Sequence, residues 1–144
     1  MIKDRAESSV FHLLTSELFA GGCGLRFQAK GQSMLPTIQD GEIVHVKPVA
    51  TDMLRIGDIV LLRTGDQFKA HRIIRKRGQC FITRGDASID SDGEIRRDQI
   101  LGRVTAKEDT NSRRLVRLDG IRARFEFFAF ETRQRVAALL MSRG

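Results

Sequence analysis

The sequence predicts a mainly β fold with an amphipathic helix at each end. Between positions 25 and 118, short segments of Val, Ile, Leu and Phe alternate with polar residues, and Gly, Pro and Asp turns separate them. Near both ends, apolar residues instead recur at spacings of three and four, which is helical periodicity. The chain has 144 residues, 41% of them apolar and 30% charged, which suits one folded globular domain. We therefore expect one domain, 1–144, with a helical N-terminus (1–22), a β core (25–118) and a C-terminal helix (121–141).

The predicted elements follow in chain order. An N-terminal helix over residues 5–19 is expected to end at the glycines that follow it. A polar acidic loop is expected over residues 85–93. Seven strands are predicted over 25–30, 43–47, 57–62, 67–75, 79–83, 99–106 and 113–118. The C-terminal helix is predicted from an apolar stripe of Ile121, Phe125, Phe128, Thr132, Val136, Leu139 and Leu140.

Composition argues against several classes of function. Cys23 and Cys80 lack the spacing of metal ligands, so no metal or cofactor is expected, and both cysteines are expected to be small buried side chains. No run of about 18 apolar residues is present, so no membrane-spanning helix is predicted. The N-terminus also lacks the features of a secretory signal.

The net charge of +7 lies mostly in the last third of the chain. Residues 96–144 hold twelve Lys and Arg against six Asp and Glu. Such a face could meet nucleic acid, anionic lipid or an acidic partner, but it is more often simply solvated. No nucleic-acid partner is expected, whereas residues 121–141, with four phenylalanines and several arginines, could make a peripheral membrane contact or pack on the core. The chain is accordingly expected in the cytoplasm or peripherally at a membrane.

Ser33 is the first candidate for chemistry. It lies between Gly31 and a Met-Leu-Pro turn, and an Asp-Gly turn follows at once. Pro36 fixes its own φ, so the backbone around the serine is expected to be rigid. This placement suits a nucleophile, although a serine that only caps the local bend would look the same.

A serine nucleophile needs a base, because a hydroxyl is a weak nucleophile at neutral pH. His12 lies in the predicted N-terminal helix, and His45 alternates with two valines, so both are expected to be structural. His71 lies on a strand that the acidic loop follows across one hairpin, and a carboxylate behind a histidine stabilises the imidazolium. Lys69 shares a strand face with His71 and is the alternative base.

Four sequence blocks in order resemble type I signal peptidases, within the wider superfamily that includes LexA-type self-cleaving repressors. The resemblance covers about residues 25–104. The blocks are Gly-x-Ser-Met-x-Pro-Thr-Ile-x-Asp-Gly from 31, Gly-Asp-Ile-Val from 57, His-Arg-Ile-Ile from 71 and Arg-Gly-Asp-Ala from 84. The resemblance implies a β-rich core of coiled antiparallel sheets or a partly open barrel. It also implies a serine endopeptidase whose partner is a peptide or preprotein substrate.

The resemblance also assigns roles. Ser33 would be the acyl-forming nucleophile, its own N–H would help bind the oxyanion, and Met34 would line the substrate cleft. The base position holds His71, as in the endoplasmic-reticulum and archaeal type. Asp92 would orient the histidine, and Asp86 would support the loop or share that role.

Two departures keep other functions open. Gly31 stands where signal peptidases commonly have a hydroxyl that donates to the oxyanion, and losing one such donor typically costs about 10²–10³ in rate. The usual membrane anchor is not seen. The alternatives are a LexA-like self-cleaving or regulatory dimerisation module, with Ala20-Gly21 and Cys23-Gly24 as candidate cleavage dipeptides, and an inactive relative that only binds peptides.

Overall fold

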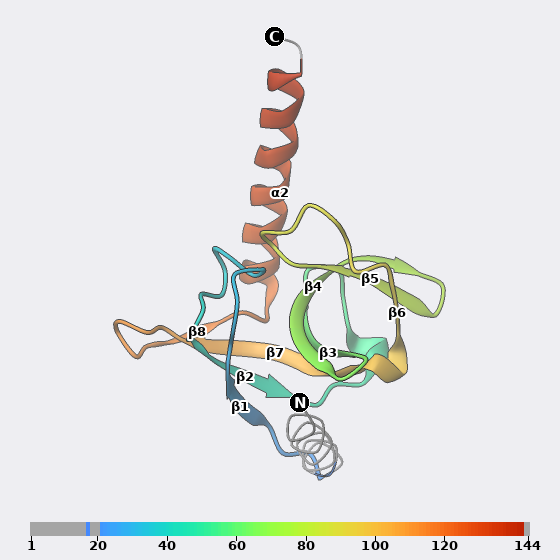
Figure 1. Ribbon diagram of the computed structural model, residues 1–144, viewed down its shortest axis with the longest axis vertical. Helices are drawn as coiled ribbons and strands as arrows, with labels where there is room; N and C mark the ends of the chain where they lie inside the picture. Colours follow the sequence, from blue (N-terminus) through green and yellow to red (C-terminus); the bar gives the residue numbers. More distant parts are fainter. Residues whose placement is uncertain (1–16, 18–20, 143–144) are drawn as a thin grey trace.

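The computed structural model describes Glu17 and residues 21–142, and its main feature is one strongly curled antiparallel sheet (Figure 1). Seven strands follow one another in the order β1-β2-β7-β3-β4-β5-β6, and β8 pairs with β7. The mainly β prediction is confirmed. The strands are β1 (Leu25–Gln28), β2 (Ile43–Lys47), β3 (Ile59–Thr64), β4 (Gln67–Arg77), β5 (Cys80–Arg84), β6 (Glu94–Arg96), β7 (Ile100–Glu108) and β8 (Leu115–Arg117).

Strand β3 is buried on both faces, which explains its unbroken apolar run. Ile59 and Leu61 join one core cluster, with side chains from β2 and β7 and with Met34. Val60 and Leu62, pointing the other way, join a second cluster with β5 and β6. The two clusters lie on opposite sides of the strand, and this double burial makes β3 the centre of the fold.

Strand β7 joins the two halves of the sheet. One of its edges pairs with β2, while the other pairs first with β3 and then with β8. Register shifts interrupt the β2–β7, β3–β7 and β4–β5 pairings, and such bulges strengthen local twist. The sheet curls as a result, and the strand that carries His71 lies within reach of the turn that carries Ser33.

Several predicted boundaries were wrong by a few residues, and some elements were missed. Strand β6 lies just beyond the predicted acidic loop. It has three residues, of which only Ile95 is buried, so it shows too little alternation of apolar and polar residues to be detected. Two short 3-10 helices, Thr51–Met53 and Arg97–Gln99, also escaped prediction. The predicted N-terminal helix over 5–19, including His12, lies almost wholly outside the described residues.

Helix α2 (Ile121–Met141) does not pack through the apolar stripe that predicted it. Phe125 is 74% exposed, and Val136 and Leu139 are also exposed, whereas Phe127 is buried. Figure 1 shows the helix running away from the sheet, so its last turns have no strand to cover them. No described helix combines the length and apolar character needed to cross a bilayer.

The cysteine expectation was partly wrong. Cys23 is exposed and Cys80 only half-buried, and both are free thiols. Cys23 lies in the short glycine-rich stretch before β1, where nothing from the sheet covers it. Whether Cys23 is buried or exposed could not be inferred from composition, because it depends on that local position.

Candidate active site

Ser33 is exposed on a turn that the core holds from below. Met34, only 5% exposed, inserts into the first core cluster. Gly31 has φ +90°, a conformation that favours glycine, and its N–H donates to Asp40 Oδ1 at 2.7 Å. A serine at position 31 would be strained in this conformation.

The loop after β5 holds the Ser33 turn from the other side. Ala87 N–H donates to the Ser33 carbonyl oxygen at 2.9 Å. A Cβ added to Gly85 would lie 2.5 Å from that same oxygen. The glycine is therefore required by close approach of two backbones, and it fixes where the Ser33 side chain is presented.

His71 lies between Ser33 and Asp92. Its side chain is buried on β4, with Nε2 3.1 Å from Ser33 Oγ and Nδ1 2.6 Å from Asp92 Oδ2. An ionised carboxylate can only accept hydrogen bonds, so Nδ1 donates to it. In the neutral ring Nε2 then carries the lone pair and faces the serine hydroxyl, which is the state a general base needs.

Three donors surround the Asp92 carboxylate. Besides His71, Thr83 Oγ1 donates to Oδ2 at 2.7 Å, and Lys69 Nζ donates to Oδ1 at 2.8 Å. Partial burial opposes ionisation, but hydrogen bonds from Lys69, His71 and Thr83 outweigh it and hold the pKa of Asp92 below its ordinary value. The carboxylate therefore stays charged behind the histidine.

Asp86 lies in a different network. Arg72 Nε and Nη2 donate to its two carboxylate oxygens at 2.8 and 2.7 Å, and Thr37 Oγ1 donates at 2.6 Å. No contact with His71 is recorded for Asp86 in the described part of the chain. Of its two predicted roles, this arrangement favours loop support.

The sequence was also compared with models of protein families. Residues 5–105 match the family described as Peptidase S24-like. The chain belongs to the Peptidase S24-like family. The wider superfamily assignment is thereby supported, while the endoplasmic-reticulum signal-peptidase type stays a prediction. Comparison with curated proteins finds no match.

In this Peptidase S24-like chain, a cleft of about 380 Å³ opens beside Ser33. One wall is the end of β1 and the residues after it, and the other is the start of β4. Apolar side chains dominate the lining, and Ala29 and Ala70 leave room in it. Strand β1 pairs only with β2 in the sheet, so its outer edge has no strand beside it among the described residues.

Sequence reasoning missed three residues that shape the site. Thr83 carried no signal, because its hydrogen bond to Asp92 depends on how the loop after β5 folds back. Arg72 and Gly85 belong to the sequence blocks that carry the family resemblance, but the sequence analysis assigned them no role. The other histidine among the described residues, His45, pairs with Glu108 at 2.8 Å, and with Arg26 it helps hold the pKa of Glu108 below its ordinary value. No group of metal-binding side chains is found among the described residues.

Proposed function

We propose that this chain is a serine endopeptidase of the signal-peptidase type, acting through an acyl-enzyme on Ser33. The observation that supports this most is the bridge His71 makes between Ser33 Oγ and Asp92. His71, the base predicted from the sequence, thus has the Ser33 hydroxyl within hydrogen-bonding distance of one ring nitrogen and the Asp92 carboxylate within hydrogen-bonding distance of the other. That arrangement serves nucleophilic catalysis on many unrelated folds.

In the proposed reaction, Ser33 Oγ attacks the peptide carbonyl carbon while its proton passes to His71 Nε2. The imidazolium, stabilised by Asp92, then protonates the leaving amine, and the C–N bond breaks. A water molecule then attacks the ester carbon while its proton passes to His71 Nε2. The ester C–O bond breaks, His71 returns that proton to Ser33 Oγ, and the carboxylic acid product leaves. The Ser33 backbone N–H, for which no partner is recorded among the described residues, is available to the oxyanion.

The substrate is proposed to be an extended peptide or preprotein segment beside the outer edge of β1. An unpaired strand edge binds such segments through main-chain hydrogen bonds, and side pockets select alternate side chains. Small side chains near the cut are proposed from the resemblance to signal peptidases, and the room beside Ala29 and Ala70 is where such side chains would lie. Met34 lines this cleft while its burial also anchors the turn.

The test of the nucleophile uses a fluorophosphonate probe on purified protein. We expect one covalent adduct on the wild type, which peptide mass mapping locates to Ser33, and none on Ser33→Ala. The matched control is Ser88→Ala, in the neighbouring loop. An adduct that persists in Ser33→Ala would overturn the assignment of the nucleophile.

The test of the base compares two residues on one strand. His71→Ala should lower the labelling rate about 10²–10⁴-fold, because it removes the proton acceptor. Lys69→Ala should retain most labelling, because its amine contacts Asp92 and has no recorded contact with Ser33. The opposite ranking in a time course of labelling would move the base role to Lys69.

A second candidate function is LexA-like self-cleavage, which the Peptidase S24-like match favours. Residues 21–24 are exposed and directly precede β1. Incubation of the pure protein, followed by intact mass, would then show a cut within 20–24 that Ser33→Ala lacks. If the protein stays uncut after prolonged incubation but is labelled by the probe, the function supported is an endopeptidase that cleaves other proteins. Peptide binding without labelling would indicate an inactive relative.

A further inference from the structure

A cavity lies between α2 and the β4–β5 hairpin, on the face opposite the Ser33 site. Arg72 and Arg84 are cross-strand partners whose side chains both reach α2. Their neighbours along the strands, His71 and Thr83, point the other way and contact Asp92. The cavity has a volume of about 190 Å³. It is too small to enclose a drug-sized ligand, for which about 300 Å³ is a lower bound, but it can hold a small anion.

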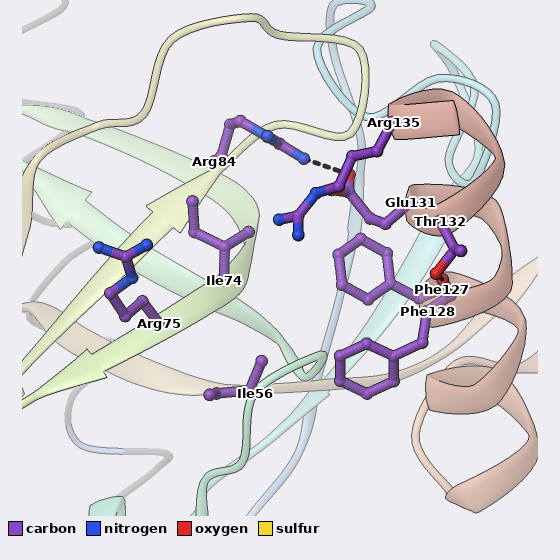
Figure 2. A pocket seen from close by; sticks show the side chains of 9 residues that line it. All are labelled: Ile56, Ile74, Arg75, Arg84, Phe127, Phe128, Glu131, Thr132 and Arg135. Atoms are coloured by element: carbon purple, nitrogen blue, oxygen red, sulfur yellow. Dashed lines mark hydrogen bonds and ion pairs between the residues drawn. The ribbon is translucent and has the colours of Figure 1, made fainter. Parts of the chain in front are cut away.

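The lining of this cavity is positively charged. Three arginines line it, Arg75, Arg84 and Arg135, against one carboxylate, that of Glu131. Figure 2 shows Arg84 from β5 and Arg135 from α2 extending toward each other, whereas the Arg75 guanidinium lies on the other side of Ile74 and points away from both. Because three guanidinium groups share one carboxylate, the cavity holds an excess of positive charge that an anion would offset.

The arginines also have unused hydrogen-bond capacity. Arg84 Nη2 pairs with Glu131, but Arg84 Nε is buried and has no partner. Neither Arg75 nor Arg135 has a recorded ion pair with a carboxylate in the described part of the chain. Buried donors in proteins are normally satisfied, so Arg84 Nε is the atom that calls for a partner, whereas Arg75 and Arg135 are exposed. Guanidinium groups match the oxygens of a phosphate in a fork.

Apolar side chains complete the cavity. Ile56 is 37% exposed and Phe128 is 48% exposed, although both line it and both are large apolar residues. Figure 2 shows one phenylalanine ring near the Arg135 side chain and the other nearer Ile56. An inorganic anion would satisfy the arginines and leave these surfaces in water, whereas an anion with an apolar part would cover both.

We propose that this cavity binds a phosphate ester whose phosphoryl group lies between Arg84 and Arg135, with the positive charge of Arg75 at the edge of the cavity, and whose apolar part lies on Ile56 and Phe128. The same chemistry is found in a phospholipid headgroup region and in a free phosphorylated small molecule. The site lies apart from the proposed acyl-transfer residues, so binding does not depend on whether Ser33 is a nucleophile.

The test is isothermal titration of the full chain with phenyl phosphate. We expect saturable binding, tighter than that of inorganic phosphate. The double variant Arg75→Gln/Arg135→Gln should weaken it at least about tenfold, since hydrogen bonds to charged groups are lost. The matched control is Arg77→Gln/Arg133→Gln, which removes the same charge from the same strand and helix outside the cavity. Circular dichroism would check that both double variants keep the fold.

Vesicle sedimentation separates the two sources of the phosphate ester. A phospholipid would be supported if the wild type and the control variant sediment with phosphatidylglycerol vesicles but not with phosphatidylcholine vesicles, and if the Arg75→Gln/Arg135→Gln variant does not sediment with either. Binding of phenyl phosphate without sedimentation would support the free molecule. Equal weakening in both double variants, or no saturable binding to phenyl phosphate and no sedimentation, would overturn the proposal.

Discussion

At the scale of single residues, the Asp92 carboxylate shows how the site is held together. Two of its three donors, His71 and Lys69, come from one face of β4, and the third, Thr83, comes from β5. Each hydrogen bond to the charged form favours ionisation. Lys69 therefore acts on the carboxylate, and through it on the orientation of the His71 ring.

Replacing Lys69 with Met should raise the pKa of Asp92, because the ammonium group is one of the groups that lower it. The measurement is a carboxyl ¹³C titration by NMR. Lys76→Met, on the same strand but beside Phe81, is the control and should leave the Asp92 titration unchanged. An unchanged pKa in Lys69→Met would show that the ion pair does not form in solution.

The same lowered pKa makes stability depend on pH. A carboxyl group with a folded-state pKa below its unfolded value stabilises the fold above the unfolded value, about 3.9. That contribution is lost as the pH falls through the folded-state pKa. Urea unfolding should therefore show the stability gap between wild type and Asp92→Asn narrowing below about pH 4. A constant gap from pH 3 to pH 7 would contradict it.

At the scale of elements, α2 shows that predicting a helix does not predict which of its faces packs on the sheet. Its apolar spacing predicts a helix correctly, yet the face that packs carries Phe127, Arg124 and Glu131. Arg124 reaches the buried carboxylate of Asp58 at 3.5 Å, and Arg72 lies 4.3 Å from the centre of the Phe127 ring. Charged and polar contacts with the sheet therefore determine which face of α2 packs. The periodicity of apolar residues carries no information about those contacts.

Two phenylalanines on α2 provide a matched test of this packing. Phe127→Ala should lower the free energy of unfolding by about 3–5 kcal/mol, because it empties a buried position. Phe125→Ala, at a position 74% exposed, should change it by less than about 0.5 kcal/mol. Chemical denaturation of both variants measures this, and the reverse ranking would mean that the predicted stripe is the packing face.

At the scale of the whole molecule, Arg72 joins segments that are distant in the sequence. It binds Asp86 in the loop after β5 through two nitrogens, donates to the Gly57 carbonyl before β3 at 2.8 Å, and lies over Phe127 of α2. Asp86 in turn holds Thr37 in the turn after Ser33. This buried ion pair therefore connects the sheet, the helix and the turn that presents Ser33.

Arg72→Met should cost about 3–5 kcal/mol in the free energy of unfolding, because it leaves the Asp86 carboxylate buried without its cation. The double variant Arg72→Met/Asp86→Leu should recover part of this loss, since no lone charge remains. Urea denaturation of Arg72→Met, Asp86→Leu and the double variant gives the coupling free energy between the two residues. Additive losses in the two single variants would contradict a direct interaction.

The sequence by itself determined the mainly β class, most strands, the helical C-terminus and the residue types of the site. Local alternation and turn residues carry that information, because they act over a few neighbours. Only the tertiary structure decided that Asp86 pairs with Arg72 and does not share the contact of Asp92 with His71, and that α2 packs through Phe127. These choices depend on the curl of the sheet and on hydrogen bonds between segments far apart in the chain, which no local pattern encodes.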